Sequence, residues 1–273
     1  MKTDAAPRIH GPVAAGRLAL LFLRVGAMNE MQYRVNFFLQ LVQSLLTLGT
    51  GLVVLALVYG RTDELGGWSR PELLAVLGVF TLMGGLIRTV IQPNMQRLLE
   101  GIHQGTLDFS LTKPADAQVL VSVREVQIWQ AVDILVGAAV LIVAVVQLHG
   151  QLGWGDAVAF ATLLVLGATM IYCFWLIMAT GAFWLVRMEQ VQELFDGVYR
   201  AGQYPIGIYP GWLRAGLTFL VPLAFAVTAP SEAVTSRLTA GTVAVAAAFT
   251  VALLVLSRAF FRLGLRRYSG ASA

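Results

Sequence analysis

Long apolar runs with almost no charge, separated by short polar segments, dominate the pattern of the chain. A helix needs about 20 apolar residues to cross the hydrocarbon core of a bilayer. Five runs meet or approach this length: 35–59, 72–91, 128–148, 157–186 and 239–257. One water-soluble core cannot bury so much apolar surface, so the pattern predicts an all-α polytopic membrane protein. Glycines in the second and third runs favour close helix packing within the chain.

The position of one further span stays open between the fourth and last runs. Hydropathy alone favours 212–229, although Pro222 interrupts it. The alternative is a shorter, more polar span at 191–209, followed by a broken helical hairpin at 211–237 in the outer leaflet. Irregular backbone at membrane depth is tolerated only where protein or a water-filled cavity surrounds it. Prolines that would supply the breaks are Pro205, Pro210, Pro222 and Pro230.

Cations collect outside the first and last runs. Before the first run stand Lys2, Arg8, Arg17, Arg24 and Arg34. After the last run come four arginines and no acid: Arg258, Arg262, Arg266 and Arg267. The positive-inside rule then places both termini in the cytoplasm, which requires an even number of spans, and we expect six. The expected parts are a cytoplasmic segment, one transmembrane domain and a basic tail: 1–34, 35–257 and 258–273.

The N-terminal segment leaves two interpretations open. It is compatible with an amphipathic helix along the membrane surface. It is equally compatible with an ordinary basic flank that only enforces topology.

Composition removes two other classes of protein. Charged residues make up 12% of the 273 residues, about half the usual load of a soluble domain. The isoelectric point near 9.5 does not indicate nucleic-acid binding, because the cations flank apolar runs instead of forming a phosphate-binding patch. The single cysteine, Cys173, excludes an intrachain disulfide.

Motifs that are typical of enzyme sites are missing from the sequence. Neither lysine lies in a phosphate-binding G-x-x-x-x-G-K-[ST] loop, and the three histidines are scattered without metal-ligand spacing. We therefore expect no catalytic, cofactor or metal site in this chain. Any uphill transport must draw its energy from another subunit or from an ion gradient.

A few charged residues lie inside the apolar segments, where they are functional candidates by default. Arg88 and Asp133 fall at similar depth in the second and third runs, and we predict that they pair. The alternative is that Arg88 extends to the membrane interface. Asp196 and Arg200 are four residues apart and are expected to pair on one helix face.

Three motifs in order resemble the ABC-2 type permeases. They are "NEMQYRVNFFLQL" before the first span, "EGIHQGTLDFSLTKPADAQVLVS" after the second, and "YPIGIYPGWLRAGLTFLVPLAFA" before the last. Within these permeases the chain is similar to the short six-span subfamily whose loop reads G-x-L-D-[FY]-x-L-x-K-P. The resemblance extends from about residue 18 to residue 267. The pre-span motif has Glu30, Tyr33, Arg34 and Asn36 at its defining positions.

The resemblance implies the transmembrane subunit of an ATP-binding cassette exporter with a type V-like fold. Such permeases dimerise, and separate ATPase subunits bind ATP and Mg²⁺, so none is expected in this chain. The loop at 92–127 would carry the coupling helix, within about 94–116. Its charged contacts would be Glu100, Asp108 and Lys113, and its other motif residues Gly101, Gly105, Leu107, Phe109 and Pro114. The resemblance also implies a re-entrant pair, which favours the broken hairpin at 211–237.

Several further expectations follow from the resemblance. The protein would lie in the bacterial inner membrane, and its second permease would be a related chain sooner than a second copy. Neither the apolar spans nor the motifs identify the cargo, although the spans favour a hydrophobic or amphipathic molecule. An ion-coupled carrier and a non-transporting membrane scaffold are the alternatives.

Overall fold

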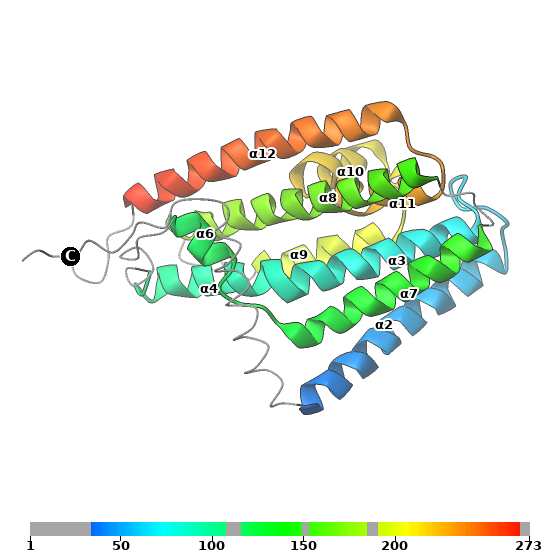
Figure 1. Ribbon diagram of the computed structural model, residues 1–273, viewed down its shortest axis with the longest axis horizontal. Coiled ribbons are helices and arrows are strands. Elements are labelled where there is room, and N and C mark those ends of the chain that lie inside the picture. Colours follow the sequence, from blue (N-terminus) through cyan, green and yellow to red (C-terminus); the bar gives the residue numbers. More distant parts are fainter. Residues whose placement is uncertain (1–33, 108–115, 149–152, 185–190, 268–273) are drawn as a thin grey trace, which may run out of the picture.

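The computed structural model describes residues 34–107, 116–148, 153–184 and 191–267, and within these ranges the regular structure is helical throughout. Five helices are long and apolar enough to cross a membrane: Val35–Tyr59, Arg70–His103, Ile128–Gln147, Trp154–Gly181 and Gly241–Arg267. These correspond to the five apolar runs of the sequence. The prediction of an all-α polytopic membrane protein is therefore confirmed (Figure 1).

The second of these helices is longer than predicted. α3 (Arg70–Leu86) continues through a π-helical turn (Ile87–Ile91) into α4 (Gln92–His103). The combined 34 residues extend about 50 Å, whereas the hydrocarbon core is about 30 Å thick. Part of this helix must therefore project beyond the membrane, and Figure 1 shows α4 at the end of the bundle where α12 (Ala240–Arg267) ends.

Pro93 explains part of the local geometry between α3 and α4. Proline has no N–H, so it cannot donate to the carbonyl of Thr89 four residues earlier. That carbonyl accepts a hydrogen bond from the backbone N–H of Gln127 instead, at 2.9 Å. The carbonyl left free by Pro93 thus binds Gln127, which lies just before the next helical segment.

α3 is the centre of the bundle and packs along α7 (Val132–Gln147). The two backbones approach closely at glycines, as the sequence predicted. A Cβ atom at Gly137 would lie 2.3 Å from the backbone nitrogen of Leu82, and one at Gly85 would lie 2.6 Å from that of Ile134. No side chain fits at either position without moving a backbone.

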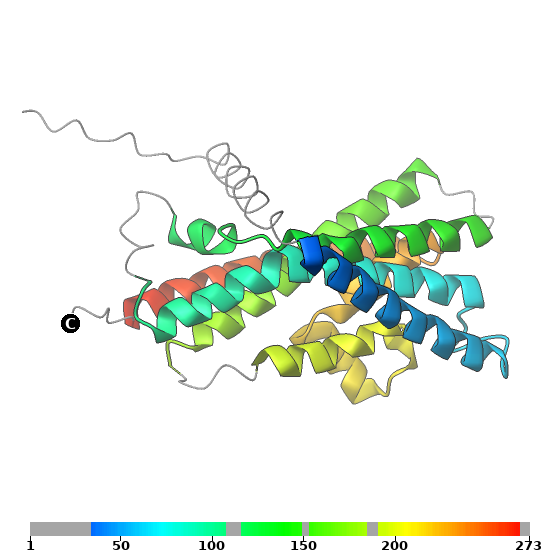
Figure 2. The same cartoon turned by 90° about the horizontal axis from the view of Figure 1, so that it is seen from below.

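The remaining helices surround this pair. α2 (Arg34–Tyr59) packs beside α3 and α7 at one edge of the bundle (Figure 2). On the other side, α8 (Trp154–Gly181) packs against α12 (Ala240–Arg267). α12 runs through residues 258–267, so the first part of the expected basic tail continues this helix.

The region between the fourth and last apolar runs forms short helices separated by breaks, and not one straight helix. α9 (Val191–Tyr199) is extended by 3₁₀ turns at Arg200–Gln203 and Ile206–Ile208. The chain then forms α10 (Gly211–Ala215) with its π-helical extension to Leu220, and a second arm from Ala224 through α11 (Ala229–Val234). The two arms are bent by 78° at the break that contains Pro222.

Both ends of this hairpin lie at the same end of α3. Before the hairpin, Ile208 packs against Gly66, in the loop that precedes α3. After the hairpin, Arg237 binds Glu72 in the first turn of α3, with N–O distances of 2.6 and 2.9 Å. A straight span at 212–229 would separate its ends by the membrane thickness. The structure therefore favours the hairpin at 211–237 over that span.

Candidate functional site

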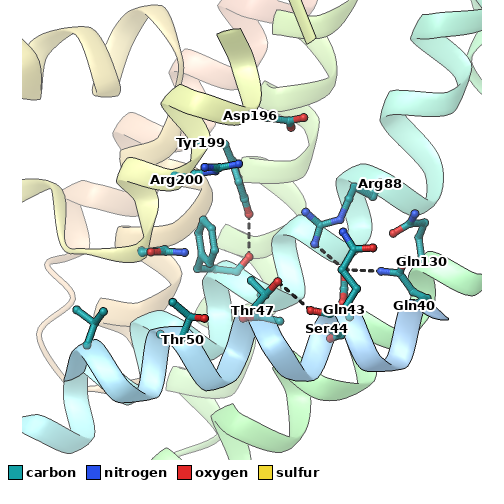
Figure 3. Close-up of a pocket in the computed structure, with 16 residues that line it drawn as sticks. Gln40, Gln43, Ser44, Thr47, Thr50, Arg88, Gln130, Asp196, Tyr199 and Arg200 are labelled. Atoms are coloured by element: carbon teal, nitrogen blue, oxygen red, sulfur yellow. Dashed lines mark hydrogen bonds and ion pairs between the residues drawn. The ribbon is translucent and has the colours of Figure 1, made fainter. Parts of the chain in front are cut away.

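A polar cavity of about 540 Å³ opens between α2, α3, the start of α7 and α9 (Figure 3). Three of its walls belong to helices that are apolar enough to span a membrane, and α9 supplies the fourth. Its polar lining residues are Gln40, Gln43, Ser44, Thr47, Thr50, Thr81, Arg88, Gln130, Asp133, Asp196, Tyr199, Arg200 and Gln203.

α2 supplies a stripe of amides and hydroxyls to this cavity. Gln40, Gln43, Ser44, Thr47 and Thr50 follow a helical spacing that places them on one face. Sequence analysis missed this stripe because the run has no charge and its mean hydropathy is high. The helical spacing of five polar residues was the signal that could have revealed it.

The predicted pair of Arg88 and Asp133 is present on the cavity wall. An Arg88 guanidinium nitrogen lies 2.5 Å from Oδ2 of Asp133. The amide of Gln40 also donates to this oxygen, at 3.3 Å. The Asp133 side chain is only 5% exposed, whereas that of Arg88 is 40% exposed. Arg88 thus neutralises a buried carboxylate and still presents part of its guanidinium to the cavity.

α9 contributes the opposite wall and is fixed to α3 through Tyr199. The Tyr199 hydroxyl donates to the carbonyl oxygen of Phe80 at 2.8 Å, and the two rings stack at 4.7 Å (Figure 3). Asp196 and Arg200 both line the cavity. The expected ion pair between them is not among the ion pairs of the described residues. Arg200 is the first residue of the 3₁₀ turn that follows α9.

The described part of the predicted coupling loop surrounds a second cavity, of about 500 Å³. Three predicted residues line it, namely Glu100 and Gly101 on α4 and the buried Leu107. Gly105 has a φ of +68°, a left-handed conformation that suits glycine and lets the chain turn after α4. The other motif residues lie outside the described ranges: Asp108, Phe109, Lys113 and Pro114.

Asn94 holds the far end of this loop against α4, a role that sequence analysis missed. Its side chain is fully buried and makes four hydrogen bonds. The amide nitrogen donates to the carbonyls of Val90 and Glu125, both at 2.7 Å. The side-chain oxygen accepts from the backbone nitrogens of Arg124 and Glu125, both at 2.8 Å. An ion pair of 2.6 Å between Arg97 and Glu125 adds to this attachment.

α6 (Ala117–Ser122) is attached to two membrane helices by its polar side chains. Asp116, the N-cap of α6, binds Arg258 of α12 through both carboxylate oxygens. The hydrogen bond from Arg258 lowers the pKa of Asp116 to about 2. Gln118 and Ser122 both contact the Tyr172 hydroxyl of α8, at 3.2 and 2.7 Å.

The pre-span motif does not form part of either cavity in the described ranges. Glu30 and Tyr33 lie outside them. Arg34 is the first residue of α2, and Asn36 is exposed in its first turn. The motif therefore stays a prediction from the resemblance.

The bundle of apolar helices, with a bent helical pair and a polar cavity between helices, defines a polytopic membrane protein. A sequence comparison gives the particular family. The model of the family described as "ABC-2 family transporter protein" matches residues 45–272, and the chain belongs to this family. Comparisons with curated proteins and with solved structures gave no match. Membership implies the permease component of an ABC transporter, with an ABC ATPase as partner.

Proposed function

We propose that this chain is the permease subunit of an exporter, in which two permease chains enclose the translocation path and separate ATPases supply the energy. The observation that best supports the proposal is the polar cavity between α2, α3, α7 and α9. Three candidate membrane-spanning helices and α9 contribute hydrogen-bonding groups to it, and such groups are costly inside a membrane unless they serve a path or a partner.

The position of α4 and α6 supports an ATPase contact at one end of the bundle. α4 projects beyond the length that the hydrocarbon core requires, and the loop after it returns through α6. Asn94 and Arg258 connect this segment to α4 and α12. Movement of a bound ATPase would therefore be transmitted directly to membrane helices. ATP and Mg²⁺ would bind to the ATPase and not to this chain.

The surface of α2 supports a second permease chain as a partner. Large apolar side chains on this helix are more than half exposed, among them Val35, Phe38, Leu39, Val42 and Leu46. Lipid covers part of this surface in our proposal, and the second permease covers the side on which the polar cavity opens. The resemblance favours a related chain over a second copy, and a bacterial inner membrane as the location.

An amphipathic cargo fits the lining better than a purely hydrophobic one. The cavity beside Arg88 is polar. A separate groove of about 780 Å³ between α2, α3 and α7 is mostly aliphatic, with Leu55, Leu74 and Val140 among its lining residues. In our proposal the polar part of such a cargo binds in the polar cavity, and the aliphatic groove offers a surface suited to its apolar part.

The decisive experiment is purification of the native complex in lipid nanodiscs, followed by identification of its chains. We expect an ABC ATPase and a second permease, with vanadate-sensitive ATP hydrolysis and vanadate-sensitive export. Export that an ionophore abolishes and vanadate does not affect would instead identify an ion-coupled carrier. A complex without an ATPase and without transport would identify a scaffold.

The coupling loop has its own test. Replacing Asp108 and Lys113 together should reduce export per ATP hydrolysed while membrane insertion stays normal. Unchanged export in this double variant would assign the segment to a simple linker.

A further inference from the structure

We propose that the cavity lined by Ser44, Arg88 and Gln130 binds an uncharged, hydroxyl-rich group, such as the glycosyl part of an amphipathic cargo. The inference rests on the proposed function only in naming the ligand as cargo. The cavity itself and its hydrogen-bonding groups are features of the described residues.

Two buried polar atoms in the cavity wall have no hydrogen-bond partner. They are Oγ of Ser44, whose residue is 4% exposed, and Oε1 of Gln130. A buried polar atom without a partner is unfavourable, because it has lost its hydrogen bonds to water. The two residues belong to different helical elements and line one cavity. Rotation of each side chain would turn these buried atoms toward a molecule bound there. An alkyl chain in the same place would leave both unpaired.

The threonine hydroxyls add acceptors to the wall. Thr47 donates its proton to the carbonyl of Gln43 at 2.9 Å, and Thr50 donates to that of Leu46 at 2.8 Å. Thr81 donates to the carbonyl of Leu77 in the same way, at 2.8 Å. With its proton used, each hydroxyl offers the cavity its oxygen lone pairs. The wall therefore favours ligands that bring several donors.

Donors are also present, and the charges balance. Arg88 and Arg200 contribute two positive charges to the lining, and Asp133 and Asp196 contribute two negative charges. Because these charges sum to zero, the lining as a whole exerts no long-range attraction on a ligand of either sign. Hydroxyl groups both donate and accept, so a polyhydroxylated ring can pair with acceptors such as Thr47 and with the exposed part of the Arg88 guanidinium.

The experiment compares two ligands that share a six-membered oxygen ring and a hexyl chain. Hexyl β-D-glucopyranoside carries ring hydroxyls, whereas 2-hexyloxytetrahydropyran lacks them. Binding to the intact complex in nanodiscs is measured by saturation-transfer-difference NMR, with hexyltrimethylammonium and hexyl phosphate as charged probes. We expect the glucoside to bind and the other three to bind at least about fivefold more weakly, as expected for loss of one or more hydrogen bonds.

Variants locate the binding. Ser44→Ala and Thr47→Val should each weaken glucoside binding by about fivefold. Thr162→Val is the matched control, because the Thr162 hydroxyl makes the same bond to the carbonyl four residues earlier, at 2.7 Å, on an exposed face of α8 away from the cavity. This control should leave glucoside affinity unchanged.

Three results would overturn the inference. One is equal or stronger binding of the ether or of a charged probe. Another is unchanged glucoside affinity in both cavity variants. The third is loss of the second permease from the complex in Ser44→Ala, which would assign the polar stripe to a permease interface. The same preparations report on the ATPase by mass spectrometry, so absence of the ATPase counts against the proposed function and not against the cavity.

Discussion

Asp116 and Arg258 are 142 residues apart in the chain, yet they form a bidentate ion pair that joins α6 to α12. Asp116 also accepts hydrogen bonds from the backbone nitrogens of Gln118 and Val119, so it caps α6 while it binds α12. One carboxylate therefore sets both the start of the short helix and its attachment to a membrane helix.

Breaking this pair should affect coupling more than stability. Both side chains are over a third exposed, and an exposed pair contributes less than about 1 kcal/mol. We expect Arg258→Gln to leave the thermal midpoint of the complex almost unchanged and to lower export per ATP hydrolysed. Measuring both quantities in proteoliposomes checks this. The reversed pair, Asp116→Arg with Arg258→Asp, should restore part of the coupling, and a large fall in stability in Arg258→Gln would contradict the prediction.

The same pair predicts a dependence on acid pH. The hydrogen bond from Arg258 lowers the pKa of Asp116 from its ordinary 3.8 to about 2 in the folded protein. A lowered pKa stabilises the attached state above the ordinary value, and this contribution is lost as the pH falls from about 4 toward 2. Intrinsic-rate-corrected hydrogen exchange of the α6 amides should thus be constant from pH 7 to 4.5 and rise below pH 4. In Arg258→Gln the rise should be smaller, because the folded-state pKa of Asp116 then lies closer to its ordinary value.

Substitution of Asn94 should strongly lower the free energy of unfolding, because its polar side chain is buried and fully hydrogen-bonded. Asn94→Leu removes four hydrogen bonds and leaves the backbone nitrogens of Arg124 and Glu125 without their acceptor. We expect a loss of about 3 kcal/mol or more in the free energy of unfolding, measured by denaturant titration in detergent. Asn36→Leu, at an exposed position in α2, is the control and should change little. Equal effects of the two variants would show that the loop attachment is energetically unimportant.

Arg88 and Asp133 should behave as one unit. Asp133→Asn alone leaves Arg88 without its carboxylate, and Arg88→Gln alone leaves a carboxylate that is only 5% exposed without its cation. Each single change should therefore reduce folding yield and transport more than their combination does. A double-mutant cycle on the unfolding free energy should give a coupling of about 1–3 kcal/mol. Strictly additive losses would mean that the contact contributes nothing.

The contact between α3 and α7 should not tolerate a methyl group. Gly137→Ala would place a Cβ 2.3 Å from the backbone of Leu82, so we expect a destabilisation of about 1–3 kcal/mol from overpacking. Gly49→Ala is the control, since a Cβ on this helical glycine of α2 meets no atom within 4 Å. A thermal-shift assay should show a lower midpoint for the first variant and an equal or higher one for the second.

The sequence determined the features that depend on the hydropathy of a single segment and on local backbone geometry. Five apolar runs became five membrane-spanning helices, because a segment that buries its backbone in lipid must be helical and about 20 residues long. Pro222 marked the break of the hairpin, since proline cannot continue the helical ladder. The pairing of Arg88 with Asp133 also followed from the sequence, because two opposite charges at one depth have few other partners.

Only the tertiary structure decided which faces of the helices meet. Hydropathy averages over a helix, so it could not show that Ser44 and its polar neighbours share a cavity with Gln130 and Tyr199. In the sequence, Arg258 was one of several cations that indicate the orientation of the chain in the membrane. In the structure it binds Asp116. Asn94 looked like an ordinary loop residue until its four partners surrounded it. Apart from the bond between Asn94 and Val90, these hydrogen bonds join residues at least 30 positions apart. Packing across the whole bundle, and not the local pattern, brings such residues together.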